Sequence, residues 1–208
     1  MIRNYLKISW RNLARDKSYT AINIFGLAIG LAACLMIGLY ISDELSYDKF
    51  HDHSERTYRV YVDGKFGNNR IRSVLTSNPL KETLLREFPE VEAATQFFKN
   101  DQVRVSHKDK RFIENDVYFA CSGFFEVFSF PLIEGDPETA LSKPNQIVLT
   151  ESMVAKYFGN EDPMGKTLVL YGELPFQVTG VCRDVPDHSH FHFKYLASYV
   201  STEKSKDP

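Results

Sequence analysis

The hydrophobic pattern is dominated by one unbroken apolar run near the start of the chain. Residues from Thr20 to Ile41 carry no charged side chain over 22 positions, and Asn23 is the most polar of them. A helix needs about 20 apolar residues to cross the ~30 Å of hydrocarbon in a bilayer. The pattern therefore predicts a membrane-spanning helix over residues 19–42.

An amphipathic pattern precedes this run. Spacings of four, four and three residues place apolar side chains on one stripe of a helix, at Ile2, Leu6, Trp10 and Leu13. A row of basic side chains lies beside it, at Arg3, Lys7, Arg11 and Arg15. Such a helix suits a membrane interface, with its tryptophan at headgroup level. We predict a basic amphipathic helix over residues 1–18; a disordered basic flank is the alternative.

The charges on either side of the apolar run predict which end of the helix faces the cytoplasm. Five bases and a single acid, Asp16, precede the run, whereas Asp43, Glu44 and Asp48 follow it. Lys and Arg are retained on the cytoplasmic side of a membrane. We therefore expect a cytoplasmic N-terminus, a helix in the bacterial inner membrane, and a periplasmic location for residues after about 43.

Two other interpretations of the run are weaker. A secretory signal peptide has an apolar core of about 7–15 residues, and here Leu35 to Ile41 continue past any cleavage site. Leu31 to Cys34 resembles a lipoprotein processing box, but the same apolar residues would follow the new N-terminal cysteine in place of a polar tether. We therefore favour an uncleaved membrane helix.

Three glycines, Gly26, Gly30 and Gly38, interrupt the predicted membrane helix. The first two form a small-xxx-small pattern, which lets another helix approach closely. We predict that these glycines mark a helix-packing face; the alternative is that the helix merely tolerates them.

The remainder of the chain predicts one α+β domain over residues 43–208. Residues 42–56 are expected to extend the membrane helix before it breaks. Asn78 and Pro79 have the types favoured at the start of a helix, which Pro89 would end, and Thr150 would cap a helix reaching Phe158. Strands are expected at 58–63, 92–98, 102–107, 111–115, 146–149, 167–170 and 176–183. The chain stops at Pro208 without a closing element, so we expect it to be truncated.

Composition narrows the function. The formal net charge of -2 gives no basic field for nucleic acid. Of the three cysteines, Cys121 and Cys182 lie in the predicted domain and could pair in an oxidising compartment; two separate buried thiols are the favoured alternative.

Candidate chemistry is sparse. Gly165-Lys166-Thr167 ends like a phosphate-binding loop, but Gly159 lies at the wrong spacing and a helix precedes the glycines where a strand should. Five histidines cluster in the sequence, and could ligate a metal together with Asp187, but the partners of a zinc signature are missing; they are His51, His53, His188, His190 and His192. We predict no catalytic, cofactor-binding or metal-ligating residue in this chain.

Ordered motifs along the chain resemble the MacB-like/FtsX-like ABC transporter permeases. The motifs are Arg11-Asn12-Leu13, the stretch from Glu44 to His51, Arg56-x-Tyr58-Arg59-Val60, the stretch from Phe124 to Leu132, Gly135-Asp136-Pro137, the stretch from Val148 to Ser152, Tyr157-Phe158-Gly159, Asp162-Pro163-x-Gly165-Lys166 and Phe176-x-Val178-Thr179-Gly180-Val181. The resemblance implies one membrane helix followed by a mixed α/β periplasmic core domain of the MacB type. It also implies three further membrane helices, which this chain lacks.

The resemblance implies a function as well. Such permeases pair as dimers and work with a cytoplasmic ATPase subunit that binds ATP, and some contact a periplasmic adaptor. We therefore expect a permease subunit that couples ATP hydrolysis by its partner to periplasmic conformational change or efflux. The alternative is a single-pass, membrane-anchored periplasmic sensor or binding module; a membrane-anchored hydrolase lacks any supporting motif.

Overall fold

A computed structural model describes residues 2–67 and 69–203 of the chain. The chain divides into two compact units, Met1–Tyr47 and Asp48–Pro208. Each unit is considered by itself.

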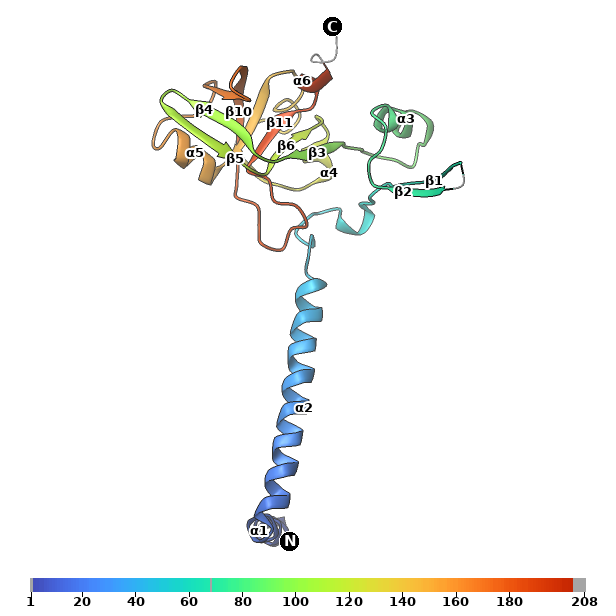
Figure 1. The fold of residues 1–208 in the computed structure, drawn as a ribbon, viewed down its shortest axis with the longest axis vertical. Coiled ribbons are helices and arrows are strands. Elements are labelled where there is room, and N and C mark those ends of the chain that lie inside the picture. Colours follow the sequence, from blue (N-terminus) through green and yellow to red (C-terminus); the bar gives the residue numbers. More distant parts are fainter. Residues whose placement is uncertain (1, 68, 204–208) are drawn as a thin grey trace. The chain divides into compact units, whose positions relative to one another are not determined.

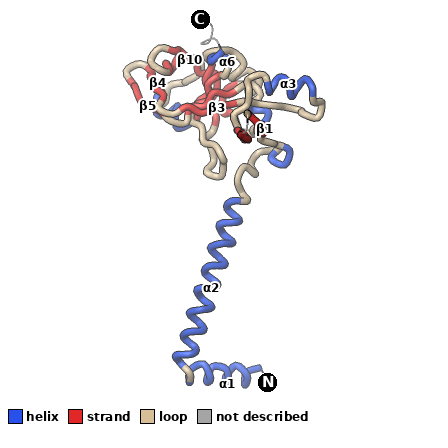
Figure 2. Tube along the Cα trace, turned by 45° about the vertical axis from the view of Figure 1, so that its right-hand side comes forward, coloured by secondary structure: helices blue, strands red, loops and turns tan. Residues whose placement is uncertain are grey.

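The first unit consists of two helices, α1 (Ile2–Arg15) and α2 (Lys17–Glu44). They meet at a sharp corner beside Asp16, where the Thr20 hydroxyl donates to the Leu13 carbonyl over 3.0 Å. Figure 2 shows α1 running across the axis of α2. With 28 residues, α2 is about 42 Å long and is apolar enough to cross a membrane. The helix predicted over 19–42 therefore exists, extended at both ends.

The second unit is built on a mixed sheet (Figure 1). Its strands among the described residues are β3 (Phe97–Asn100), β4 (Val103–His107), β5 (Lys110–Glu114), β6 (Val117–Ala120), β7 (Leu132–Gly135), β8 (Gln146–Thr150), β9 (Thr167–Leu170), β10 (Leu174–Cys182) and β11 (Tyr195–Ser198). Their order is β3-β6-β11-β8-β10-β9-β4-β5, and β7 also pairs with β10. The pairs β6–β11 and β8–β10 are parallel and the others are antiparallel.

Both faces of this sheet are covered, because its central strands are buried on both sides. In β6, Val117 and Phe119 face one hydrophobic cluster, while Tyr118 and Ala120 face the other. The first cluster includes residues of α5 (Glu151–Tyr157). The second is rich in aromatic rings and includes residues of the short helix α4 (Phe124–Val127). We call this second cluster the aromatic face.

The described residues between 57 and 96 contribute to neither cluster. They include a two-stranded ribbon, β1 (Val62–Phe66) and β2 (Asn69–Ser73), and a helix, α3 (Leu80–Glu87). Two arginines, Arg70 and Arg72, bind the Asp63 carboxylate across the ribbon. A short helix, α6 (Val200–Glu203), follows β11.

Several local predictions were wrong. The helical extension over 42–56 is absent, since α2 ends at Glu44 and turns follow. The strand predicted at 58–63 begins at Val62, because the turn at Gly67 sets the register of the ribbon. The predicted start of the helix at Asn78 and Pro79 was also displaced, because Pro79 is the residue that precedes α3. The Asn78 carboxamide instead accepts a hydrogen bond from the Tyr199 hydroxyl over 2.8 Å.

Candidate functional site at the start of the sheet domain

The second unit, which we call the sheet domain, begins with a short segment. The segment is bonded to residues that lie 77 to 142 positions away in the sequence. We call residues Asp48–Arg56 the anchor segment. Only residues 45–47 separate it from the end of α2. Asp48 adopts a positive φ of 56°, which aspartate tolerates better than most residues. A tight turn follows, in which the His51 N–H donates to the Asp48 carbonyl, and the segment ends in a 3-10 turn, η1 (Ser54–Arg56).

Two rings of the anchor segment pack on the aromatic face. His51 is 5% exposed. Its ring centroid lies 5.3 Å from that of Phe128 and 5.0 Å from that of Phe130. Phe50 lies 5.5 Å from Phe130. These contacts bury apolar surface, so His51 and the partly buried Phe50 attach the segment to the hydrophobic core of the domain.

A reciprocal pair of hydrogen bonds fixes the same contact. The Asp52 N–H donates to the Ser129 hydroxyl over 3.0 Å, and the Ser129 N–H donates to His51 Nδ1 over 3.1 Å. Ser129, which lies between Phe128 and Phe130, therefore takes part in both hydrogen bonds.

The other end of the anchor segment is tied to the loop between β10 and β11. The Asp48 N–H donates to the His188 carbonyl over 2.9 Å. The Asp48 carboxylate accepts a hydrogen bond from the backbone N–H of His190 over 3.1 Å, and it also lies 2.8 Å from the ring atom Nδ1 of His190. The segment is thus held at two places, the turn at Ser129 and the loop at His190.

The ionisation of His51 is set mainly by burial. Burial lowers the pKa of His51 below its usual 6.5, and the nearby Asp48 and Asp52 carboxylates oppose this shift without reversing it. The ring is therefore neutral at pH 7. Since Nδ1 accepts a hydrogen bond, the neutral ring carries its proton on Nε2, which is buried and has no hydrogen-bond partner among the described residues.

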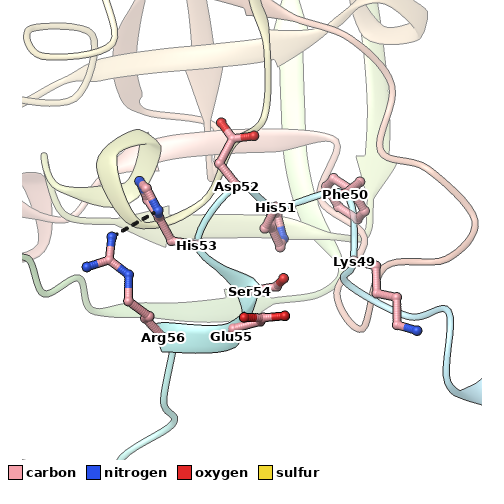
Figure 3. Close-up of a pocket in the computed structure, with 8 residues that line it drawn as sticks. All are labelled: Lys49, Phe50, His51, Asp52, His53, Ser54, Glu55 and Arg56. Atoms are coloured by element: carbon pink, nitrogen blue, oxygen red, sulfur yellow. Dashed lines mark hydrogen bonds between the residues drawn. The ribbon is translucent and has the colours of Figure 1, made fainter.

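A shallow depression of about 360 Å³ lies along the anchor segment (Figure 3). All its lining residues are consecutive, from Lys49 to Arg56. The Arg56 guanidinium lies near His53 and pairs with Glu92 over 2.8 Å, but both side chains of that ion pair are exposed, so it adds little stability. Because one continuous segment builds the depression, it does not bring side chains together from separate elements.

The residues predicted as functional in the first unit lie on its two helices. Gly26, Gly30 and Gly38 are on α2, and a Cβ added at any of them would meet no described atom within 4 Å beyond the neighbouring backbone of its own helix. The basic and aromatic residues are on the exposed surface of α1; they are Arg3, Lys7, Trp10, Arg11 and Arg15. The packing and interface roles of these residues stay predictions.

The clustered histidines have separate roles. His190 and the His188 backbone bind Asp48, whereas His51 packs on the aromatic face. Within residues 2–67 and 69–203, no group of three or more His, Cys, Asp or Glu side chains is placed to hold a metal ion. Cys121 and Cys182, both among the described residues, are not joined by a disulfide. Burial raises the pKa of the Cys182 thiol to about 12.

The sequence did not identify Ser129 or the pairing of Asp48 with His190. A signal was present, because two motifs that carried the family resemblance, Glu44 to His51 and Phe124 to Leu132, contain Asp48 and Ser129. Those two motifs pack against each other in the structure.

Comparison with known proteins agrees with the resemblance. The family model of the MacB-like periplasmic core domain matches residues 20–205. The macrolide export ATP-binding/permease protein MacB of Aggregatibacter actinomycetemcomitans is 23% identical over 183 residues, which are 86% of this chain and 28% of that protein.

Two solved structures share the fold. The periplasmic region of MacB from Actinobacillus actinomycetemcomitans matches with a TM-score of 0.52 and 21% identity, covering 70% of this chain and 66% of that one. A domain assigned to a permease protein from Porphyromonas gingivalis matches with a TM-score of 0.56 and 22% identity, covering 64% and 56%.

This chain spans about 28% of the length of the curated relatives it matches. The family match nevertheless covers most of the chain, including most of α2 and the whole sheet. Together with the apolar helix, it indicates a membrane-anchored protein. The chain belongs to the family of the MacB-like periplasmic core domain.

Proposed function

We propose that this chain is part of the permease subunit of an ABC exporter, in which ATP hydrolysis by a partner drives movement of the sheet domain. The observation that carries the proposal is the family match, which runs from the apolar helix through the sheet. The curated relatives, which are named as export ATP-binding/permease proteins, support it further.

The proposed arrangement follows the charge pattern. The N-terminus lies in the cytoplasm, α2 spans the inner membrane, and the sheet domain is periplasmic. The corner at Asp16 supports an interfacial position for α1, because a helix that runs across a membrane-spanning helix lies along the bilayer surface. Its basic side chains then face the lipid headgroups and the ATPase.

The anchor segment is the proposed mechanical link. A movement of α2 reaches Asp48 through only three residues. From there it passes to the loop at His190, which leads directly into β11. It passes also to Ser129, which precedes β7. The two attachments distribute a displacement over the sheet instead of bending a free linker.

The proposed partners are a cytoplasmic ABC ATPase, which binds the ATP, and a second permease protomer, which packs on the face of Gly26, Gly30 and Gly38. A periplasmic adaptor is a further candidate. This chain contributes no catalytic residue to ATP hydrolysis; its contribution is conformational.

The test is hydrogen exchange on the protein encoded by the complete reading frame, purified with its ATPase from native membranes. We expect ATP to change exchange in β10 and β11. Asp48→Gly removes the carboxylate that binds His190 and keeps a residue suited to positive φ. We expect this variant to reduce the ATP-dependent change about fivefold, the lower end of typical coupling factors, while ATP hydrolysis continues.

Asp187→Gly is the matched control, because Asp187 is an exposed aspartate on the loop that carries His190. It should leave the ATP-dependent change intact. If no ATPase co-purifies, and three further apolar runs are missing downstream in the reading frame, the permease proposal fails and the single-pass sensor replaces it.

A further inference from the structure

We propose that His51 makes the anchor segment acid-sensitive: the neutral imidazole holds the segment on the aromatic face, and protonation of the ring releases it. The mechanical consequence of this release rests on the function proposed above for the anchor segment. The release itself rests only on the contacts of the His51 ring.

Protonation removes the bond that positions the ring. His51 Nδ1 accepts the Ser129 N–H over 3.1 Å. An imidazolium has donors on both nitrogens, so it cannot accept this bond, and two N–H groups would face each other. The Ser129 N–H would then lose its acceptor, and the neighbouring bond from the Asp52 N–H to the Ser129 hydroxyl would lose its geometry.

The surroundings of the ring do not accommodate the added charge. Phe50, Phe128 and Phe130 surround the ring, with centroids 4.0–5.3 Å away. Within the part of the chain that the structure describes, the buried Nε2 has no hydrogen-bond acceptor. A charge in such an environment is costly unless it is paired and hydrogen-bonded. Moving the segment into water relieves the cost, so protonation favours release.

Charged and titratable groups lie near the ring on two elements. The Asp48 and Asp52 carboxylates, on the anchor segment itself, favour the protonated ring. The turn from Phe128 to Phe130 contributes no ionisable side chain. The loop between β10 and β11 contributes His190, whose Nδ1 lies 2.8 Å from the Asp48 carboxylate. A variant at His190 therefore serves to separate its contribution from that of His51.

The direction of the pH effect follows from the lowered pKa of His51. Below 6.5, the ordinary value, the released segment binds a proton more readily than the attached one. Attachment is therefore strongest above 6.5 and weakens as the pH falls toward the lowered pKa, where the loss is complete. Within this window the equilibrium changes by up to about tenfold for each pH unit, as expected for one proton.

Hydrogen exchange on the full chain in nanodiscs tests the proposal, with rates corrected for their intrinsic dependence on pH. We expect protection of the Ser129 and Asp52 amides to fall between pH 7.5 and pH 5, by up to about tenfold per unit below 6.5. Amides of β8 and β11 serve as the internal reference and should stay protected. His51→Gln keeps a side-chain acceptor and cannot titrate, so its response should be flat.

His190→Gln is the matched control and should retain the loss of protection in acid. The proposal is overturned if the wild-type amides keep their protection at pH 5, or if His51→Gln responds as the wild type does. Either result leaves the ATP-dependent test at Asp48 untouched, because that test is made at neutral pH.

A direct titration keeps the proposal testable if His51→Gln does not fold. In the ¹³C-histidine-labelled full chain, the resonance of His51 is the one retained after each of the other histidines is replaced in turn. It should titrate below pH 6.5, together with the exchange of the Ser129 amide. A His51 resonance that titrates at or above 6.5 overturns the proposal.

Discussion

Phe124→Ala should lower the free energy of unfolding of the sheet domain by about 3–5 kcal/mol, the range for removing a buried phenylalanine side chain. Phe124 is fully buried in the aromatic face. Its ring stacks with Phe130 at 5.9 Å and meets Phe193 edge-on at 5.7 Å. The cavity left by alanine would also loosen Phe130, on which His51 packs.

The measurement is the urea midpoint of the full chain, followed through the β-sheet signal in circular dichroism. Tyr58→Ala is the control, because Tyr58 is 83% exposed, and it should change the free energy of unfolding by less than about 0.5 kcal/mol. Equal effects of the two substitutions would show that the aromatic face is not a packed core.

Glu114→Ala should lower the free energy of unfolding by about 2–3 kcal/mol, since it leaves two polar groups without their shared acceptor. Glu114 ends the edge strand β5, and its side chain is 6% exposed. It accepts hydrogen bonds from Lys156 Nζ and, over 2.7 Å, from the Tyr157 hydroxyl, both on α5. Burial, and to a smaller extent the Glu114 carboxylate, raise the pKa of Tyr157, so its phenol stays a donor.

The control for this prediction is Glu161→Ala. Glu161 also binds two lysines, Lys108 and Lys166, but it is more than half exposed, so its removal should lower the free energy of unfolding far less than removal of Glu114. The same denaturation measurement compares the two variants. If Glu114→Ala costs no more than Glu161→Ala, the β5 carboxylate does not attach the edge of the sheet to α5.

Local patterns predicted the elements that depend on nearby residues. The long apolar helix and the strands β4 and β5 are examples, because an uncharged apolar run and short strand patterns are visible in the sequence itself. The strands β6 and β11 were not predicted. All four residues of each are buried on the two faces of the sheet, so neither strand shows the alternation that identifies a half-buried strand.

The anchor segment could be predicted only as a motif. Its bonds join residues 77, 78 and 142 positions apart, to Ser129 and His190. Contacts at such separations depend on the order of strands in the sheet, which a single sequence does not encode in any local pattern. The family resemblance identified the two segments as motifs, and only the structure shows that they touch.

We propose that α2 separates a cytoplasmic α1 from an exported sheet domain. The most direct test labels introduced cysteines in spheroplasts with a membrane-impermeant maleimide. The measured quantity is the labelling in excess of that of the unsubstituted chain, which has cysteines of its own. Glu173→Cys, exposed in the sheet domain, should be labelled in intact spheroplasts, and Ser18→Cys, at the start of α2, only after they are permeabilised. Labelling in the reverse order, or a chain shortened by cleavage within residues 20–41, would contradict the account.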